Sequence, residues 1–254
     1  NIRRMRRLAR DAQVRDSEGL FVVEGPRLVQ EAIEAGLKID QVILPEDELD
    51  DALLMVLSQE KIHFNLVPRK IFDGLTTLRN PQAAIAAVRK HDLGLTSVIE
   101  KKETMLILLG VADPGNCGNL IRTSEAFGVS TILFYGGVDP YNPKVVRSSA
   151  GSFFRVSFSI LPESFSYTLL FEELNSYGYR TIATASSGGL PPEDVLIDKQ
   201  VALILGNEPR GLPEEIEDSC DKTITIPIEK SVESLNVATA GAIALYAIRR
   251  SIGV

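Results

Sequence analysis

The first stretch with side chains that could do chemistry is DPGNCGNLIRTSEAFG. Asn116 lies at the start of an expected helix, where its amide could bond backbone or a sugar hydroxyl. Arg122 and Glu125 are three residues apart, so they would share one face of that helix while apolar residues cover the other. Such a pair is either a solvated salt bridge, which is the commoner case at surfaces, or a pair that handles an anion.

A second stretch, ALILGNEPRGL, ends a buried apolar run with a glycine. Gly206 would let the flat ring of a ligand approach the backbone closely, because glycine has no β-carbon. Glu208 and Arg210 are the polar groups available beside it. A plain β-turn is the alternative interpretation of this stretch.

The third stretch, IPIEKSVESLNVATAGAIALY, predicts a helix with an exposed first turn and a buried body. Ser234 is placed to cap the helix, Asn236 lies just inside it, and small residues such as Gly241 would allow tight packing. The amides of a first turn have no partner within the helix. Ile226 and Leu235 flank them, an arrangement that suits an adenine ring; an ordinary core helix is the alternative.

One α/β pattern must position these three stretches. Apolar runs that predict strands occur at 105–111, 131–136, 154–160, 179–186, 201–206 and 222–228. Continuous apolar runs are typical of a parallel sheet covered on both faces, and ligands bind outside the carboxyl ends of such strands. We therefore predict a mostly parallel sheet with the three stretches at one rim, and a polar loop at 139–152.

The N-terminal part of the chain predicts a smaller α/β domain. Its strands are expected at 20–25, 39–44, 63–67 and 83–89, with helices between them. The polar segment 91–104 has no strong periodicity, so we predict domains at 1–95 and 104–254. The first domain carries no Gly-rich phosphate loop or paired carboxylates, which favours a binding module.

Composition narrows the class of protein. A chain of 254 residues, 44% of them hydrophobic, can bury a substantial core. No apolar run approaches a membrane span of about 20 residues and nothing resembles a signal peptide, so we expect a cytoplasmic protein. Two cysteines and two histidines supply few ligands, and we expect no metal site. The sequence begins at Asn1 and not at methionine, so we expect residues upstream.

A nucleic-acid partner would need a local basic patch, because the net charge of the chain is −7. Residues 1–18 contain six arginines and three acidic residues, a net charge of +3. A solvated helix face is the alternative interpretation of this basic arm.

In sequence order, DPGNCGNLIRTSEAFG, DPYNPKVVRSSAGSFFRV, ALILGNEPRGL and IPIEKSVESLNVATAGAIALY resemble the motifs of the SpoU (TrmH) family of RNA ribose 2'-O-methyltransferases. The resemblance covers about residues 104 to 250, and four motifs in order are specific. The family belongs to the SPOUT class, whose C-terminal half forms a deep trefoil knot. Residues 1–90 resemble, more diffusely, the L30e-like RNA-binding domain common at the N-terminus of this family.

The resemblance implies S-adenosylmethionine as methyl donor, RNA as substrate and a homodimer formed through the C-terminal domain. It implies that Gly206, Ile226 and Leu235 hold the cofactor through main-chain groups, and we place Asn207 and Thr184 with them. By the same motif positions the reaction centre comprises Asn116, Arg122, Glu208, Ser234 and Asn236. We expect the RNA to be bound by Arg3, Arg4, Arg7 and Arg147.

The implied reaction is an in-line attack of a ribose 2'-oxygen on a sulfonium methyl group. We expect Arg122 to bind the phosphate next to the target ribose and to favour the developing alkoxide. Arginine is a poor general base because its pKa lies above about 12, which leaves phosphate or water to take the proton. The sequence departs from the family pattern at Cys117, Asn119, Pro209 and Lys230, so we do not carry the family's loop geometry and RNA preference over to this chain.

Large-subunit ribosomal RNA is the favoured substrate, because the two-domain layout is typical of such members. Transfer RNA and an antibiotic-resistance role are alternatives. A non-catalytic RNA-binding protein on the same scaffold is a further alternative. A conventional doubly wound nucleotide-binding enzyme would carry a Gly-rich fingerprint after its first strand, and PGNCG is a poor version of it.

Overall fold

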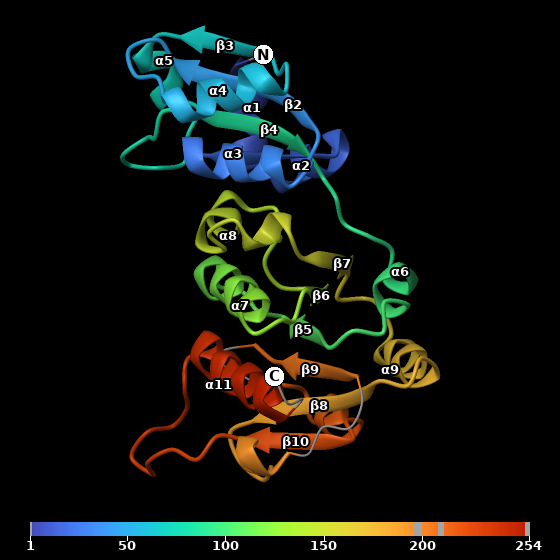
Figure 1. Cartoon of the computed structure of the whole chain (residues 1–254). Helices are drawn as coiled ribbons and strands as arrows, with labels where there is room; N and C mark the ends of the chain where they lie inside the picture. The colour runs from blue at the N-terminus through green and yellow to red at the C-terminus, as the bar shows by residue number, and fades with distance from the viewer. Residues whose placement is uncertain (1, 196–199, 208–210, 252–254) are drawn as a thin grey trace. The chain divides into compact units, whose positions relative to one another are not determined.

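The computed structural model describes residues 2–195, 200–207 and 211–251. The chain divides into two compact units, each with its own sheet (Figure 1). The first unit comprises Asn1–His91 with Asp139–Arg155, and the second comprises Asp92–Val138 with Val156–Val254. Contacts therefore group residues 139–155 with the N-terminal unit, whereas the division predicted from the sequence places them in the C-terminal domain.

The first unit is built on a four-stranded sheet ordered β1-β4-β2-β3. Its strands are β1 (Leu20–Glu24), β2 (Ile39–Pro45), β3 (Phe64–Val67) and β4 (Ile85–Arg89). Strand β4 runs antiparallel to β1 and β2, and β2 runs parallel to β3. The helices between and before them are α1 (Ile2–Arg10), α2 (Ala12–Glu18), α3 (Pro26–Glu34), α4 (Asp51–Gln59) and α5 (Arg69–Asp73). All four strands predicted from the sequence are confirmed.

The basic arm is an amphipathic part of this unit. Met5 and Leu8 of α1 are fully buried in the core with Phe72 and Ile85, while most of the arginines on α1 remain exposed. Burial of the apolar stripe of a surface helix stabilises the fold and leaves the charged face in water. The arm is therefore held in one place by its own apolar face.

The second unit contains a six-stranded sheet in which every pairing is parallel, in the order β10-β8-β9-β5-β6-β7. Its strands are β5 (Met105–Leu109), β6 (Thr131–Tyr135), β7 (Ser157–Leu161), β8 (Arg180–Ala185), β9 (Val201–Leu205) and β10 (Lys222–Thr225). This confirms the predicted parallel sheet. The trefoil knot implied by the resemblance stays a prediction.

Helices cover both faces of this sheet, as the continuous apolar runs predict. On one face, α6 (Leu95–Ile99), α9 (Tyr167–Ser176) and α10 (Glu214–Asp218) pack on inward side chains such as Met105 and Ile204. On the other face lie α7 (Pro114–Ala126) and α11 (Val237–Ser251), which pack against each other (Figure 1). A β-carbon on Gly241 would lie 2.4 Å from a methyl of Leu120, so glycine permits this close approach.

Three expectations from the sequence need correction. Residues 139–152 are not only loop: they contain α8 (Pro143–Ser148), and a 3₁₀ turn, Ser152–Phe154, follows. The segment 91–104 contains α6. Both helices have five or six residues, too few for a hydrophobic period to show. Finally, the residue that caps α11 is Asn236 and not Ser234, because its Oδ1 accepts from the amide of Ala238 at 2.9 Å.

Candidate active site

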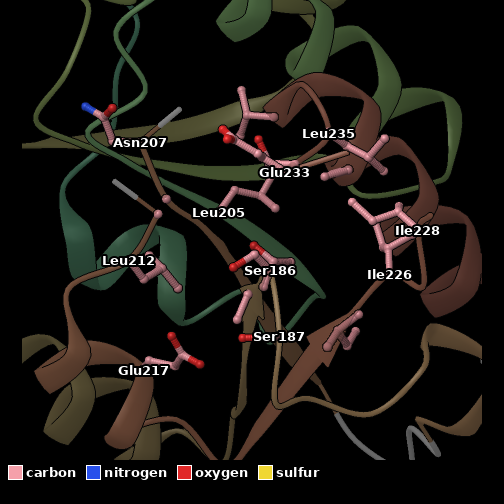
Figure 2. Close-up of a pocket in the computed structure, with 18 residues that line it drawn as sticks. Ser186, Ser187, Leu205, Asn207, Leu212, Glu217, Ile226, Ile228, Glu233 and Leu235 are labelled. Atoms are coloured by element: carbon pink, nitrogen blue, oxygen red, sulfur yellow. The ribbon is translucent and has the colours of Figure 1, made fainter. Parts of the chain in front are cut away.

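The carboxyl ends of the parallel strands meet at one edge of the second sheet, and a pocket of about 460 Å³ lies there (Figure 2). Segments that follow β8, β9 and β10, together with α10 and the first turns of α11, line it. The lining residues are Thr184, Ala185, Ser186, Ser187, Leu205, Gly206, Asn207, Gly211, Leu212, Glu217, Ile224, Ile226, Ile228, Glu233, Ser234, Leu235, Val237 and Ala240. Six of the predicted site residues are among them.

Gly206 forms part of the pocket because the chain folds back on itself there. A β-carbon on Gly206 would lie 2.4 Å from the carbonyl carbon of Gly211 and 2.6 Å from the amide nitrogen of Leu212. The group that approaches Gly206 is thus the backbone of the same loop, and not only a ligand ring as the sequence suggested. The amide of Gly211 donates to the carbonyl of Asn207 at 2.8 Å and closes the loop.

Asn207 connects this loop to Gly110, three residues before the first motif begins at Asp113. Its Nδ2 donates to the carbonyl of Gly110 at 2.9 Å. Its Oδ1 is buried and accepts no hydrogen bond from the described residues. A buried polar atom without a partner is costly, so this oxygen is a candidate acceptor for a bound ligand or water.

The apolar part of the pocket comes mainly from the segment after β10. That strand ends at Thr225, earlier than predicted, so Ile226 and Ile228 leave the sheet and face the pocket together with Leu235. Leu205 and Ile224 add buried side chains from the strands themselves. The pocket therefore combines a hydrocarbon surface with nearby backbone groups.

The segment after β8 also lines the pocket, although the sequence predicted only Thr184, near the end of β8, as a site residue. Ser186 and Ser187 line the pocket and are exposed. The segment is pinned along β10, because Gly189 donates to Oγ1 of Thr225 at 2.9 Å and a β-carbon on Gly189 would clash with the carbonyl of Thr223. The rule that parallel strands end at one edge could have identified these residues.

Two carboxylates missed by the sequence analysis also line the pocket. Glu217 belongs to the short helix α10 and is half-buried, and Glu233 lies in the segment before α11 and is exposed. No arginine, lysine or histidine is among the described residues that line the pocket. In this described part the lining is therefore acidic, which favours a ligand that carries positive charge.

Outside the pocket lining, Asn116 and Asn236 lie close together. Nδ2 of Asn236 donates to Oδ1 of Asn116 at 3.1 Å, so the first turns of α7 and α11 are joined by their side chains. Asp113, and not Asn116, caps α7, because its Oδ1 accepts from the amide of Asn116 at 2.8 Å. Arg122 is exposed on α7, and its side chain makes no hydrogen bond or ion pair with described residues. Glu208 lies outside the described residues.

The arginines predicted to bind RNA have different surroundings. Arg3 and Arg7 are exposed on α1. Arg4 forms ion pairs with Glu18 and, at 2.7 Å, with Asp40. Arg147 of α8 forms an ion pair with Glu24, whose side chain is 1% exposed. An ion pair partly neutralises an arginine and weakens its attraction for phosphate, so Arg4 and Arg147 offer less positive charge to RNA than their number suggests.

Other chemistries find little support among the described residues. They contain no group of three or more His, Cys, Asp or Glu that could hold a metal ion. Desolvation by burial raises the pKa of the Cys220 thiol to about 12, so this cysteine is not a nucleophile at neutral pH. None of the described helices is both long enough and apolar enough to span a bilayer.

Two family models match the chain. Residues 103–246 match the SpoU rRNA Methylase family, and residues 1–86 match the MRM3-like substrate binding domain. The 23S rRNA (guanosine(2553)-2'-O)-methyltransferase RlmP of Bacillus subtilis (strain 168) is 29% identical over 238 residues, which are 92% of this chain and 90% of the relative.

Two solved structures align with this chain over nearly its whole length. The SpoU methyltransferase AviRb from Streptomyces viridochromogenes, in complex with the cofactor AdoMet, aligns with a TM-score of 0.87 and 25% identity, covering 99% of this chain and 98% of that one. An AdoMet-bound rRNA methyltransferase from Sinorhizobium meliloti aligns with a TM-score of 0.86 and 28% identity, covering 98% and 94%. With its four motifs, its parallel sheet and more than half of its length matched by the family model, the chain belongs to the SpoU rRNA methylase family.

Proposed function

We propose that this protein transfers a methyl group from S-adenosylmethionine to a ribose 2'-oxygen of large-subunit ribosomal RNA. The observation that carries the proposal is the pocket at the carboxyl ends of β8, β9 and β10, next to the joined side chains of Asn116 and Asn236. The relatives support it, since one acts on 23S rRNA at a 2'-oxygen and solved relatives hold AdoMet.

The residues of the pocket fit S-adenosylmethionine. A volume of about 460 Å³ lies within the range of roughly 300–1,000 Å³ found for small-molecule sites. Ile226 and Leu235 offer faces for an adenine ring, and the buried Oδ1 of Asn207 can accept a hydrogen bond. Glu217 and Glu233 supply negative charge for a ligand whose sulfonium and ammonium groups are positive. We place Gly206 and Thr184 in the same binding role.

The bound cofactor supplies an activated methyl group, so the residues of this chain must position the RNA and help the hydroxyl lose its proton. Arg122 has no ionic partner among the described residues and can bind the phosphate next to the target ribose. Its charge then stabilises the alkoxide that develops during the transfer. Asn116, Ser234 and Asn236 orient the ribose, and Glu208 completes this proposed centre.

Arg3 and Arg7 on α1, with the MRM3-like domain as a whole, give the first unit its proposed role in binding RNA. We also propose the second unit as the site of homodimer formation. On α11, Ile243 is 36% exposed and Tyr246 is 50% exposed, one helical turn apart, so that α11 presents an apolar stripe to solvent. We propose these two side chains as part of the contact between the two copies.

Arg122→Ala provides the test of the mechanism. We expect the rate of methyl transfer to a ribosomal RNA transcript to fall at least about 100-fold, because one preorganised electrostatic contact to the developing charge has roughly this effect. The Kd for S-adenosylmethionine, measured by calorimetry, should change less than twofold. Arg27→Ala is the control, an arginine whose side chain is 88% exposed on α3, and it should leave both quantities unchanged.

Several results would contradict the proposal. Full activity of Arg122→Ala removes the arginine from the mechanism. Failure of the wild-type protein to bind S-adenosylmethionine favours a non-catalytic RNA-binding protein. Mapping of 2'-O-methyl groups in cells with and without the gene identifies the RNA, and a missing methyl group in transfer RNA alone would exclude the ribosomal substrate.

A further inference from the structure

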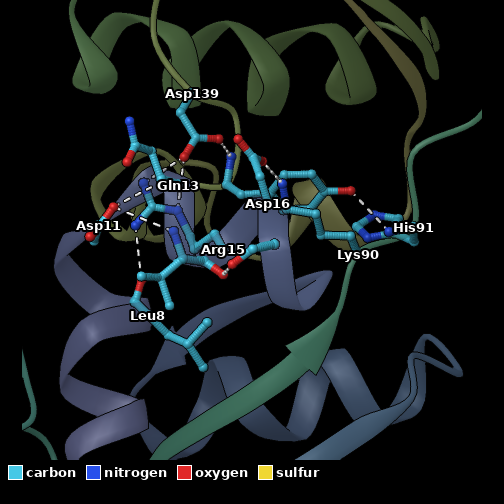
Figure 3. A network of polar contacts seen from close by, with 11 residues as sticks. Leu8, Asp11, Gln13, Arg15, Asp16, Lys90, His91 and Asp139 are labelled. Atoms are coloured by element: carbon cyan, nitrogen blue, oxygen red, sulfur yellow. Dashed lines mark hydrogen bonds and ion pairs between the residues drawn. The ribbon is translucent and has the colours of Figure 1, made fainter.

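Arg15 differs from the other arginines of the basic arm because it is buried, with a side chain that is 4% exposed. Its Nη1 donates to the carbonyl of Leu8 at 2.9 Å, while Nε and Nη2 donate to Oδ2 of Asp139 at 2.8 and 2.5 Å (Figure 3). A buried guanidinium that donates with three nitrogens is fixed in position, and it cannot also contact RNA phosphates.

Asp139 begins the segment 139–155, which is part of the first unit although its neighbours in sequence are strands β6 and β7 of the second. Oδ1 of Asp139 accepts from the amide of Tyr141 at 2.9 Å. The rings of Tyr141 and Phe153 contact Phe21 of β1 with centroid distances of 5.0 and 5.7 Å. The ion pair with Arg15 therefore fixes the first residue of a segment that is itself packed in place.

The residues that come immediately before Asp139 contact Gly110 and Val111, which lie just before the first motif, DPGNCGNLIRTSEAFG. The amide of Val138 donates to the carbonyl of Val111 at 3.0 Å, and the amide of Gly110 donates to the carbonyl of Tyr135 at 2.9 Å. A β-carbon on Gly137 would lie 2.4 Å from the oxygen of Val111, so the turn fits against residues 110–111 without spare room. A shift of this turn would therefore displace the backbone of residues 110–111, which leads into the first motif.

Residues 110–113 lead directly into α7. Asp113 caps this helix at the amide of Asn116, and Asn116 accepts a hydrogen bond from Asn236 of the fourth motif, IPIEKSVESLNVATAGAIALY. The carbonyl of Gly110 also accepts from Asn207 of the pocket. Covalent bonds and hydrogen bonds thus connect Asp139, through Val138 and Val111, to the loop that carries Asn116.

We infer that Arg15 is a positioning residue for methyl transfer: through Asp139 it fixes the turn 136–139, and this turn holds the loop 110–113 that places Asn116. The inference rests on the proposed function of that site. A displacement of about 1 Å in a reacting geometry can lower a rate on the order of 100-fold, so loss of the anchor should lower kcat. An RNA-contacting arginine would instead raise the KM for RNA.

Arg15→Met tests the inference, with Arg15→Lys and Asp139→Asn as companions and Arg27→Met as the control. Arg27 lies in the same unit, and its side chain is 88% exposed. We expect Arg15→Met to lower kcat at least tenfold, with the KM for RNA within about twofold of wild type. Arg15→Lys should recover part of the rate. Arg15→Met and Asp139→Asn combined should be no slower than the slower single variant, because the pair acts as a unit. Arg27→Met should behave as wild type.

Hydrogen–deuterium exchange supplies a readout that does not depend on activity. Amides in 110–118 should exchange faster in Arg15→Met than in wild type, and at the wild-type rate in Arg27→Met. Unchanged exchange and kcat, or a raised KM for RNA at constant kcat, would overturn the inference. A fall in activity equal to the fall in the fraction of protein that binds S-adenosylmethionine would also overturn the inference, since it indicates that the variant is partly unfolded. If the wild-type protein is inactive but amides in 110–118 still exchange faster in Arg15→Met, the proposed function is rejected, while the structural link from Arg15 to this loop is retained.

Discussion

Gly206→Ala should damage the pocket through one methyl group. In the structure, the added β-carbon would lie 2.4 Å from the carbonyl carbon of Gly211, 2.5 Å from its oxygen and 2.6 Å from the nitrogen of Leu212. These are backbone atoms, so no flexible side chain can turn away. The loop is also held at both ends, because Gly211 bonds to Asn207 and Asn207 bonds to Gly110.

The magnitude follows from this geometry. Ordinary contact begins at 3.4 Å, so the backbone of Gly211 and Leu212 must retreat by about 1 Å. Overpacking of this kind costs roughly 1–3 kcal/mol, and the rigid neighbours place this case near 3 kcal/mol. Each 1.4 kcal/mol is a factor of about ten in affinity. If the distortion falls on the pocket, the Kd for S-adenosylmethionine should rise about 10-fold to 100-fold.

Titration calorimetry with S-adenosylmethionine measures this Kd, and thermal unfolding measures the accompanying loss of stability. A chain of this length loses about 2–4 °C in Tm for each kcal/mol. Gly36→Ala is the matched control. Gly36 has a φ of +77°, and no atom lies within 4 Å of its added β-carbon, so alanine there introduces backbone strain without a clash. The control should lower Tm, by the cost of a left-handed alanine of about 1–2 kcal/mol, and leave the Kd unchanged.

An unchanged Kd for Gly206→Ala would refute this reasoning, because it would mean that the 206–212 loop can shift without affecting the bound cofactor. A raised Kd in Gly36→Ala as well would show that general destabilisation, and not the local clash, weakens binding.

Two further predictions concern the ion pair of α8 and the exposed stripe of α11. Arg147→Met should lower the free energy of unfolding in urea by about 3–5 kcal/mol, because it leaves the buried carboxylate of Glu24 without its cation. Adding Glu24→Gln should recover much of this loss. An Arg147→Met protein as stable as wild type would contradict the structural role of the ion pair. Tyr246→Asp should shift the protein from dimer to monomer in light scattering, because it places a charge on the exposed apolar stripe of α11. Leu169→Asp, at an exposed position on α9, should leave the protein dimeric. A dimeric Tyr246→Asp protein would exclude this face of α11 as the dimer contact.

Much of the fold was predictable from local pattern. The strands of both sheets follow apolar runs, and the parallel sheet followed from runs without alternation. Prediction failed for the short helices α6 and α8, which are shorter than two hydrophobic periods. It also misplaced the cap of α11, because Ser234 and Asn236 are both good caps and only the packed loop selects between them.

Much of the pocket was also predictable, since Gly206, Ile226 and Leu235 lie in motifs that follow strands. Ser186 and Glu217 were not identified because neither has a local signature: one follows a strand without a motif, and the other lies in a short acidic helix whose neighbours face solvent. Their place in the pocket depends on the order of strands in the sheet, in which β8 lies between β9 and β10.

The sequence by itself determined the family, the two sheets and the three stretches at one rim, because capping, apolar runs and glycine positions depend on residues close in the chain. The tertiary structure decided which arginines are buried and what the segment 139–155 packs against. Arg15 and Asp139 are 124 positions apart, and Glu24 and Arg147 are 123 apart. An arginine in a basic arm has the same local sequence whether it faces water or a distant carboxylate, so only the packed chain distinguishes the two.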